Sequence, residues 1–239
     1  MPLMTSRTFF WWLCLFVAPL ILLGIELFHP AHFTETPGMA QYLSKAEPYN
    51  PDYKALDYFG PGWWVTLHLI QTPSVCLFAT GLFWLVAGTS EVKLSNITAW
   101  CARVATFVFV VLYTVLDAVG GIGLGRSILL AKDMLASGQL SAEQYATVIA
   151  FLDKVWVDPV VGGVGSVVSE GGSWAAFIAS VLIATTLWLR VKAPLGALAL
   201  MVVGGWVLQE SHAALTGPIS FGLYLLSALW LWFRGVRLP

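Results

Sequence analysis

The residues best suited to chemistry in this sequence are its four histidines, which all fall near the ends of long apolar stretches, at His29, His32, His68 and His212. His68 is the most informative of them, because it follows Trp63-Trp64 closely and lies inside an apolar run. Tryptophan rings favour the membrane interface, so a helix that begins there carries His68 roughly 7 Å below that interface. A titratable ring at this depth requires a polar partner or a ligand.

Carboxylates accompany these histidines along the chain. Glu26 and His29 are three residues apart, so they share one face of the first apolar segment. The same side of the expected bundle carries three further carboxylates and another histidine, namely Asp117, Glu170, Glu210 and His212. Acidic and imidazole groups that converge from several helix ends are how a helical bundle builds a buried polar site.

Three chemistries use such a set of side chains. The first is a transition-metal site, because imidazole and carboxylate groups bind Zn, Cu, Fe or Mn; its expected ligands are Glu26, His29, His32, His68, Glu210 and His212. The second is axial ligation of haem b, with His68 and either His29 or His212 as the pair. The third is proton transfer or acid–base catalysis on a lipid or quinone-like substrate, to which Asp117 and Glu170 would contribute.

A simpler interpretation competes with all three. Histidines at helix ends, such as His29, His32 and His212, are often merely interfacial and face headgroups and water. His68 and Asp117 would then each satisfy one interhelical hydrogen bond.

The composition indicates what positions these residues. Of 239 residues, 58% are hydrophobic and only 10% are charged, whereas soluble domains carry about 25% charged residues. Six apolar segments are nearly or fully long enough to cross a hydrocarbon core of about 30 Å; they cover residues 9–29, 63–88, 98–121, 173–190, 194–212 and 217–234. We therefore expect an all-α, polytopic integral membrane protein with about six transmembrane helices. No basic stripe indicates nucleic-acid binding.

The charges predict the orientation. Basic residues favour the cytoplasmic side, and with the N-terminus inside that side receives seven of the twelve, namely Arg7, Lys93, Arg103, Arg190, Lys192, Arg234 and Arg237. Of the thirteen acidic residues only Glu91 falls there. We therefore expect an inner-membrane protein with both termini in the cytoplasm and the histidines on the external side.

Two long external segments, 30–62 and 122–172, interrupt what we expect to be a single transmembrane domain over residues 1–239. In the second segment, residues 126–136 read as a helix that stops at Gly138, and Ser141 is placed to cap an amphipathic helix lying on the membrane surface or against the bundle. The glycine-rich residues 158–172 favour a re-entrant loop.

The leading hypothesis is an integral membrane protein with a metal or haem site at its external face, serving redox or quinone-linked chemistry. One alternative is an accessory or structural subunit that packs against other membrane subunits. Another is a proton-coupled transporter, with Asp117, Glu170 and the glycine-rich stretch along its path. The residues leave open whether the protein is an enzyme, and the lipid bilayer is the one partner that every alternative shares.

Overall fold

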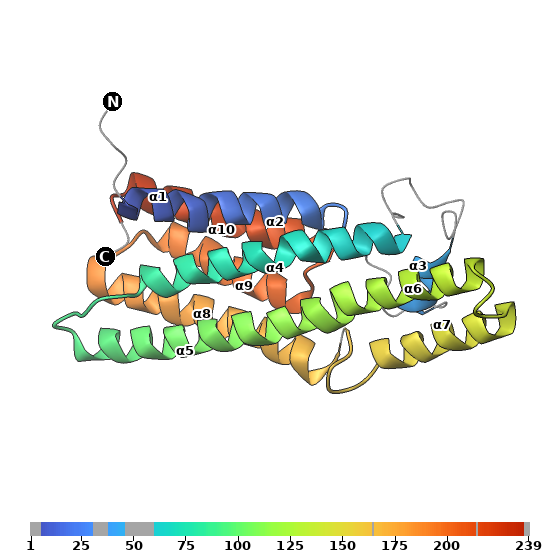
Figure 1. Ribbon diagram of the computed structural model, residues 1–239. Coiled ribbons are helices and arrows are strands. Elements are labelled where there is room, and N and C mark those ends of the chain that lie inside the picture. The colour runs from blue at the N-terminus through green and yellow to red at the C-terminus, as the bar shows by residue number, and fades with distance from the viewer. Residues whose placement is uncertain (1–5, 31–37, 46–59, 164, 214, 237–239) are drawn as a thin grey trace, which may run out of the picture. The chain divides into compact units, whose positions relative to one another are not determined.

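The fold is helical throughout the described part of the chain. In the computed structural model this part comprises residues 6–30, 38–45, 60–163, 165–213 and 215–236, and it contains no strand (Figure 1). Five helices are long and apolar enough to cross a membrane, namely Ser6–Glu26, Gly60–Leu85, Lys93–Ala136, Val167–Val191 and Thr216–Phe233. The expected all-α, multi-pass membrane architecture is confirmed, whereas the orientation of the termini stays a prediction.

The fifth apolar segment of the sequence forms a shorter helix than expected. Helix α9 (Leu195–Glu210) has 16 residues, which at the helical rise is about 24 Å. A typical hydrocarbon core is about 30 Å thick. The helix is apolar, but α9 alone is too short to span the full thickness of the hydrocarbon core.

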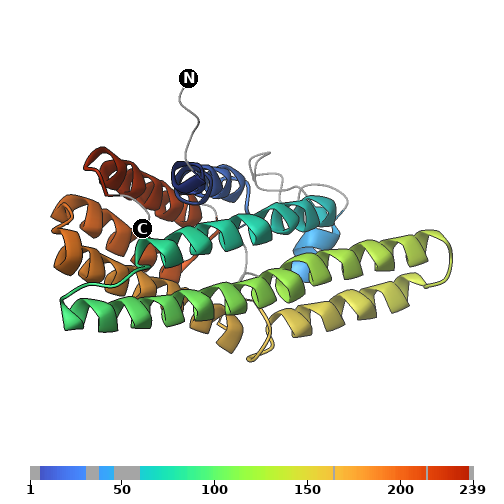
Figure 2. The same ribbon diagram turned by 60° about the vertical axis from the view of Figure 1, so that its left-hand side comes forward.

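The third apolar segment is much longer than expected. Helix α5 (Lys93–Leu116) continues through a π-helix, η3 (Asp117–Gly123), into α6 (Leu124–Ala136), without a break (Figure 2). The expected end near residue 121 is therefore wrong, because the glycines there remain helical in a π-helical turn instead of terminating the helix. The whole run of 44 residues is about 66 Å long, more than twice the thickness of the hydrocarbon core.

The chain divides into two compact units. The first comprises Met1–Leu27, Pro73–Val111 and Gly171–Pro239, and the second comprises Phe28–Thr72 and Leu112–Glu170. Helix α4 (Gly60–Leu85) and helix α5 each contribute residues to both units. The single transmembrane domain expected from the sequence stays a prediction.

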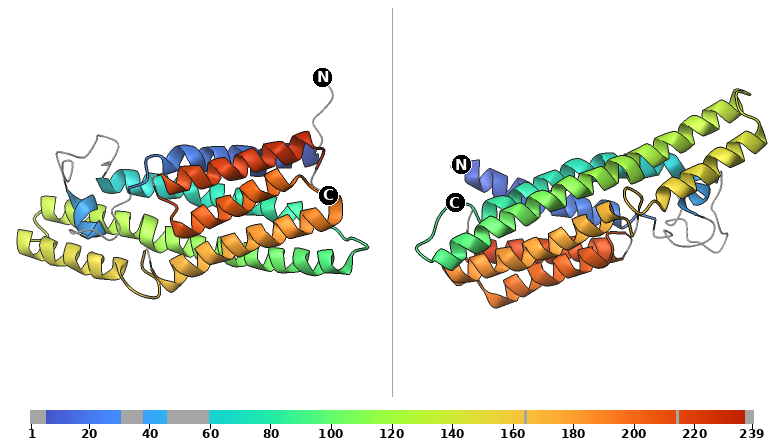
Figure 3. Two further views of the ribbon diagram at one scale, coloured as in Figure 1. Left: turned by 180° about the vertical axis from the view of Figure 1, so that it is seen from behind. Right: turned by 90° about the horizontal axis from the view of Figure 1, so that it is seen from below.

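The first unit is held together by small and hydroxyl-bearing residues between helices. Its N-terminal helical run consists of α1 (Ser6–Trp12), η1 (Leu13–Val17) and α2 (Ala18–Glu26), and α10 (Thr216–Phe233) runs beside both α2 and α9 (Figure 3). Ser220 and Ser227 of α10 donate hydrogen bonds to the carbonyls of Gly204 and Ala197 at 2.8 and 2.7 Å. Small residues allow such close approach of helices in a membrane.

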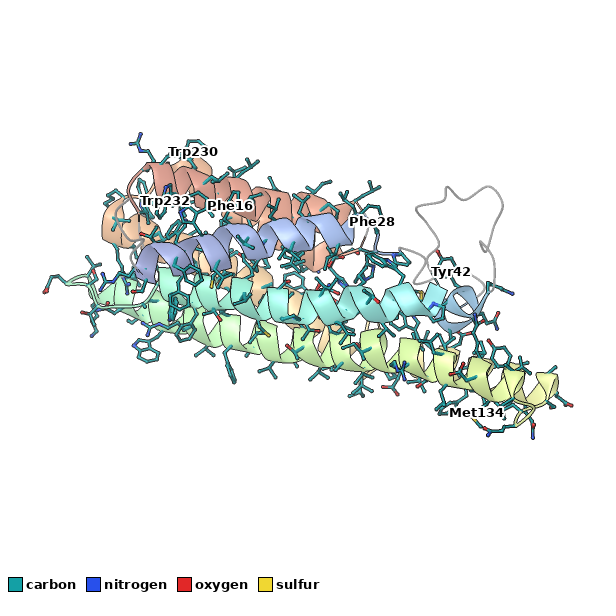
Figure 4. The ribbon with its side chains drawn as sticks, turned by 45° about the horizontal axis from the view of Figure 1, so that its top comes forward. Phe16, Phe28, Tyr42, Met134, Trp230 and Trp232 are labelled. Carbon is teal, nitrogen blue, oxygen red and sulfur yellow. The ribbon has the colours of Figure 1, made fainter. Side chains whose placement is uncertain are left out.

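Aromatic rings close one end of this unit. The Trp232 ring lies 5.3 Å from the Trp12 ring and 5.5 Å from the Trp11 ring, at the start of the N-terminal run (Figure 4).

A hydrogen bond also joins α8 (Val167–Val191) to α10, because the hydroxyls of Ser180 on α8 and Tyr224 on α10 are 2.6 Å apart. Polar side chains in this unit therefore serve mainly to join helices.

The second unit packs α3 (Met39–Ser44), α6 and α7 (Ala142–Trp156) against one another. Ser141 and Gln144 form a reciprocal capping box at the start of α7, which confirms the N-cap expected at Ser141. The apolar stripe of α7 faces the protein, with Ile149, Leu152 and Trp156 buried in a core that also contains Tyr42 of α3. Of the two placements expected for this helix, packing against other helices is the one observed.

The glycine-rich stretch forms turns and the start of a helix. Asp158 accepts hydrogen bonds from the backbone of Val160 and Val161 at 2.8 and 3.0 Å, and α8 already begins at Val167. The re-entrant loop expected over 158–172 is therefore wrong in its second half. Gly171 and Gly172 do not interrupt α8, which continues into the apolar residues that follow them.

Candidate functional site

His68 is the best-defined member of the candidate site. It lies on α4, is only 3% exposed, and its Nδ1 is 2.7 Å from the carbonyl oxygen of Trp64 one turn earlier. A carbonyl oxygen can only accept a hydrogen bond, so Nδ1 carries the proton and Nε2 holds the lone pair of the neutral ring. The backbone of α4 thus selects the tautomer of His68.

His29 meets His68 directly. Its ring is 1% exposed, and Nδ1 is 2.8 Å from the carbonyl oxygen of Pro30, which selects the same tautomer. The two imidazole centres are 5.4 Å apart with an interplanar angle of 68°, so the rings pack edge to face. Of the histidines singled out in the sequence, these two are brought together within one unit.

Trp64 is a third member of the site. As part of Trp63-Trp64 it is expected at the membrane interface, and its depth in the membrane stays a prediction, but its side chain is packed inside the protein and is only 1% exposed. Its ring centre lies 4.4 Å from that of His68 and 5.0 Å from that of His29, and its indole nitrogen donates to the carbonyl of Gly120 at 3.0 Å. The indole therefore ties the imidazole pair to η3.

The π-helix η3 forms the wall against which His68 packs. A Cβ atom at Gly121 would overlap the His68 ring, and one at Gly125 would lie 2.6 Å from Val65. The sequence Gly120-Gly121-Ile122-Gly123-Leu124-Gly125 is suited to close helix packing, and such packing is observed at Gly121 and Gly125. Single π-helical turns are rare and recur at functional sites, and this one supplies both the glycine surface and the first carboxylate of the site.

That carboxylate is Asp117, the first residue of η3, which is fully buried. Its Oδ2 accepts a hydrogen bond from the Thr72 hydroxyl at 3.0 Å, and the same hydroxyl lies 2.8 Å from the carbonyl of His68. Oδ1 has no hydrogen-bond partner among the residues that the structure describes. A buried carboxyl oxygen without a donor is costly, so its retention calls for an explanation beyond packing.

A neutral pair extends the site along α4. The amide of Gln71 donates to the hydroxyl of Tyr113 at 2.8 Å, and both residues are buried. Gln71 follows His68 by three residues, so the two share one face of α4. The sequence analysis did not identify Tyr113 and Thr72 as site residues. The one signal that could have found them is their spacing, because Tyr113 is four residues before Asp117 and Thr72 is four residues after His68.

The other residues singled out in the sequence are placed elsewhere. Glu170 is exposed in the first turn of α8, and Glu210 is exposed at the end of α9. Glu26 is fully buried at the end of α2, and His212 lies in the turn between α9 and α10, where desolvation lowers its pKa to about 4. His32 lies outside the described residues. Glu26, Glu210 and His212 belong to the first unit, so a ligand set drawn from both units stays a prediction.

No three histidine, cysteine, aspartate or glutamate side chains gather as a metal-binding group within the described ranges. The six-residue ligand set expected from the sequence stays a prediction, because it includes His32, which lies outside the described residues, and residues of both units. The second unit does bring together the pair of imidazoles and the buried carboxyl group of Asp117 on η3, which is bonded to Thr72 of α4.

An apolar cavity of about 330 Å³ lies within the same unit. It is lined by α7, by the loop after it and by the helical run through η3, mainly through Ala118, Val119, Gly120, Leu152, Val155 and Trp156. Two residues of the cavity lining, Gly120 and Trp156, also contact Trp64 of the candidate site. The carbonyl of Gly120 accepts the hydrogen bond of the Trp64 indole, and the centre of the Trp156 ring is 6.1 Å from that of the Trp64 ring.

Comparison with family models, with curated proteins and with solved structures found no match to this chain.

Proposed function

We propose that this membrane protein carries a buried proton-exchange centre, formed by His29, His68 and Asp117, that acts on an apolar, quinone-like compound. The observation that carries the proposal is the edge-to-face contact of the two imidazoles, whose Nδ1 atoms are both directed at backbone carbonyls. Each neutral ring then has Nε2 as its basic atom.

The imidazole pair is suited to hold one proton at a time. A proton on both rings would place two positive charges about 5 Å apart in a poorly solvated site, which Coulomb repulsion disfavours. The pair would therefore change its protonation state when a substrate gains or loses a proton.

Asp117 would be the second proton carrier. Its Oδ1 is buried and lacks a donor, and Oδ2 is joined through the Thr72 hydroxyl to the backbone of His68. A carboxyl group in this setting takes up a proton without breaking an existing hydrogen bond.

The cavity beside η3 supports the class of substrate. Its volume of about 330 Å³ is at the lower end of the range for small-molecule sites, and its lining is almost wholly apolar. Trp156 offers an aromatic face for a flat ring. A membrane-soluble compound of the size of a quinone head group fits these properties better than a charged metabolite.

Transition-metal binding is a second candidate, favoured by one observation. Metal-binding histidines usually donate their other ring N–H to a carbonyl or carboxylate, as the Nδ1 atoms of His29 and His68 do here. Two imidazoles on one tetrahedral ion have ring centres about 5 Å apart, given metal–nitrogen bonds of about 2 Å. The observed 5.4 Å is compatible with that arrangement.

Haem b between His29 and His68 is not supported by this geometry. Axial ligands lie on opposite faces of a porphyrin, whereas these rings touch each other edge to face and the Trp64 ring packs on both. No space for a porphyrin separates the two imidazoles.

The proposal is tested by measuring protons exchanged when a quinone analogue binds. Decylubiquinone is titrated into the purified protein calorimetrically in two buffers of different ionisation enthalpy, and the difference gives the number of protons. We expect a non-zero number that is lost in Asp117→Asn and in His68→Gln, and retained in the control Asp153→Asn, which changes a carboxyl of the same unit outside the site.

Elemental analysis of the same preparations separates the two candidates. Stoichiometric Zn, Cu, Fe or Mn that disappears in His68→Gln would favour metal binding. Binding of the analogue with no linked proton at any pH between 5 and 9 would refute the proton-exchange centre.

A further inference from the structure

A second cavity, of about 450 Å³, lies in the first unit where three helices end. It is formed by the end of α4 and the loop that follows, the last turn of α8 and the end of α10. Its lining is half polar and half apolar, and includes Leu85, Thr89, Ser90, Leu187, Arg190 and Arg234. A mixed lining of this kind suits an amphipathic ligand.

Arg190 is the fixed cation of this cavity. Its guanidinium donates to the carbonyls of Val86 and Ala87 at 3.1 and 2.9 Å and to the Ser95 hydroxyl at 2.8 Å, with longer bonds to Gly88 and Asn96. These groups are all neutral, so they orient the guanidinium and do not cancel its charge. The arginine also satisfies carbonyls at the end of α4 that have no helical partner.

Arg234 is the adaptable cation. It is exposed at the end of α10, and its side chain makes no hydrogen bond to any residue that the structure describes. A long guanidinium side chain in this position can turn toward an anion in the cavity, and a planar fork of N–H donors suits a phosphate group.

The surrounding charge favours an anion strongly. The helix ends on this side of the first unit carry six cations within the described residues, namely Arg7, Lys93, Arg103, Arg190, Lys192 and Arg234, and one acid, Glu91. The local balance is therefore six positive charges against one negative charge. Such an excess attracts anionic groups from solution or from the lipid surface.

The apolar surface in and beside the cavity favours a lipid over a free anion. Val191 lines the cavity and is 55% exposed, and outside the lining Phe233 and Trp230 on α10 are 79% and 44% exposed. Apolar side chains this exposed beside a membrane-spanning helix face acyl chains. A soluble phosphate would leave this surface uncovered.

We infer that the cavity between Arg190 and Arg234 binds the headgroup of an anionic phospholipid. The Arg234 guanidinium donates to its phosphate, Arg190 attracts it by charge because its own N–H donors are already bonded within the protein, and the acyl chains lie along the exposed ends of α8 and α10. The hydroxyls of Thr89 and Ser90 lie in the same lining and offer further donors. This site is independent of the proton-exchange centre, because it is built wholly from the first unit.

The test uses the full-length protein in detergent with phosphatidylglycerol, phosphatidylcholine or glycerol 3-phosphate as the probe. Native mass spectrometry counts retained lipids, and thermal unfolding measures protection. We expect phosphatidylglycerol to be retained and to raise Tm, with phosphatidylcholine and glycerol 3-phosphate having little effect. Arg234→Gln should lower retention about fivefold, the value expected for one surface cation at a lipid headgroup.

Arg103→Gln is the matched control, because Arg103 lies at the same end of the unit but outside the cavity lining, with its guanidinium 4.2 Å from the Trp100 ring. The control should retain phosphatidylglycerol like the unchanged protein. Equal losses in both variants would mean general charge attraction without a site. Equal protection by glycerol 3-phosphate would mean a soluble anion site, and retention unchanged in Arg234→Gln would overturn the assignment.

Discussion

The two units bury polar side chains for different purposes. In the first unit, Ser180, Ser220 and Ser227 are fully buried, and each hydroxyl is bonded to a carbonyl or a hydroxyl of a facing helix. In the second unit, the buried polar groups include His29, His68 and Asp117, which can change charge. Neutral hydroxyls join helices at low cost, whereas titratable groups are costly in a membrane and are normally kept for function. Glu26 is a buried titratable group of the first unit, but His29, His68 and Asp117 in the second unit favour that unit as the place to look for chemistry.

The largest expected effect comes from filling the glycine surface beneath His68. Gly121→Val would force a side chain into the space of the imidazole, and we expect a loss of about 3 kcal/mol in unfolding free energy. The matched control in the first unit is Gly222→Ala, whose new Cβ would lie 3.4 Å from Leu23, an ordinary contact.

Thermal unfolding of both variants measures this comparison, and histidine-labelled NMR shows whether the His68 ring has moved. If Gly121→Val is as stable as the control and leaves the His68 signals in place, the packing of His68 on η3 is wrong.

The first unit also contains titratable groups away from solvent, among them Glu26, which is fully buried, and His212. His212 provides a test of the comparison. Desolvation lowers its pKa to about 4, so the native state binds a proton less tightly than the unfolded chain does. Its contribution to stability is complete above the ordinary value near 6.5 and is lost as the pH falls toward 4. We expect a loss of about 2 kcal/mol across this window.

His212→Gln should remove that part of the acid sensitivity. The measurement is unfolding free energy against pH for both proteins. Parallel curves between pH 7 and pH 4 would contradict the burial of His212.

Asp153 tests whether a carboxyl outside the candidate site behaves structurally. Its Oδ1 accepts the backbone N–H of Ala40 at 2.6 Å and that of Gln41 at 3.4 Å, at the start of α3. Asp153→Ala should cost about 1 kcal/mol by removing these bonds, and Asp153→Asn, which retains the acceptor, should cost less.

The pH dependence of Asp153 has a definite sign. Burial raises its pKa above the ordinary value, and the bonds from Ala40 and Gln41 only partly offset this. The native state therefore binds the proton more tightly than the unfolded chain, and the stability contribution falls as the pH rises through the range just above the ordinary pKa near 4. Asp153→Asn should flatten the stability curve there, and a curve unchanged in this range would contradict the shift.

The smallest stability effects should come from the hydroxyl contacts. Ser227→Ala removes one interhelical hydrogen bond and should cost below about 1 kcal/mol. Asp117→Asn retains an acceptor for Thr72 and should leave unfolding nearly unchanged while abolishing ligand-linked proton exchange. A Ser227→Ala protein that also lost proton exchange would remove the distinction between the two units.

Several local features could be read from the sequence because they depend on neighbouring residues. The capping of α7 at Ser141 follows from a serine placed three residues before Gln144, and the close packing at Gly121 and Gly125 follows from the absence of side chains there. The end of the third helix was misplaced, because glycines in an apolar setting can stay helical as η3. The burial of the Trp64 side chain was not predicted, because its ring is equally suited to an interface and to a core.

The sequence by itself determined the class of this protein, since length, apolarity and the spacing of charged residues are properties of each segment alone. It also indicated that histidines and carboxylates gather near helix ends. Only the tertiary structure decided that His29 meets His68, and that Asp117 meets Thr72, which is 45 residues earlier. Helix α4 is apolar on nearly every side, so its periodicity does not reveal its rotation. The partner of each side chain depends on that rotation, and packing against η3 sets it.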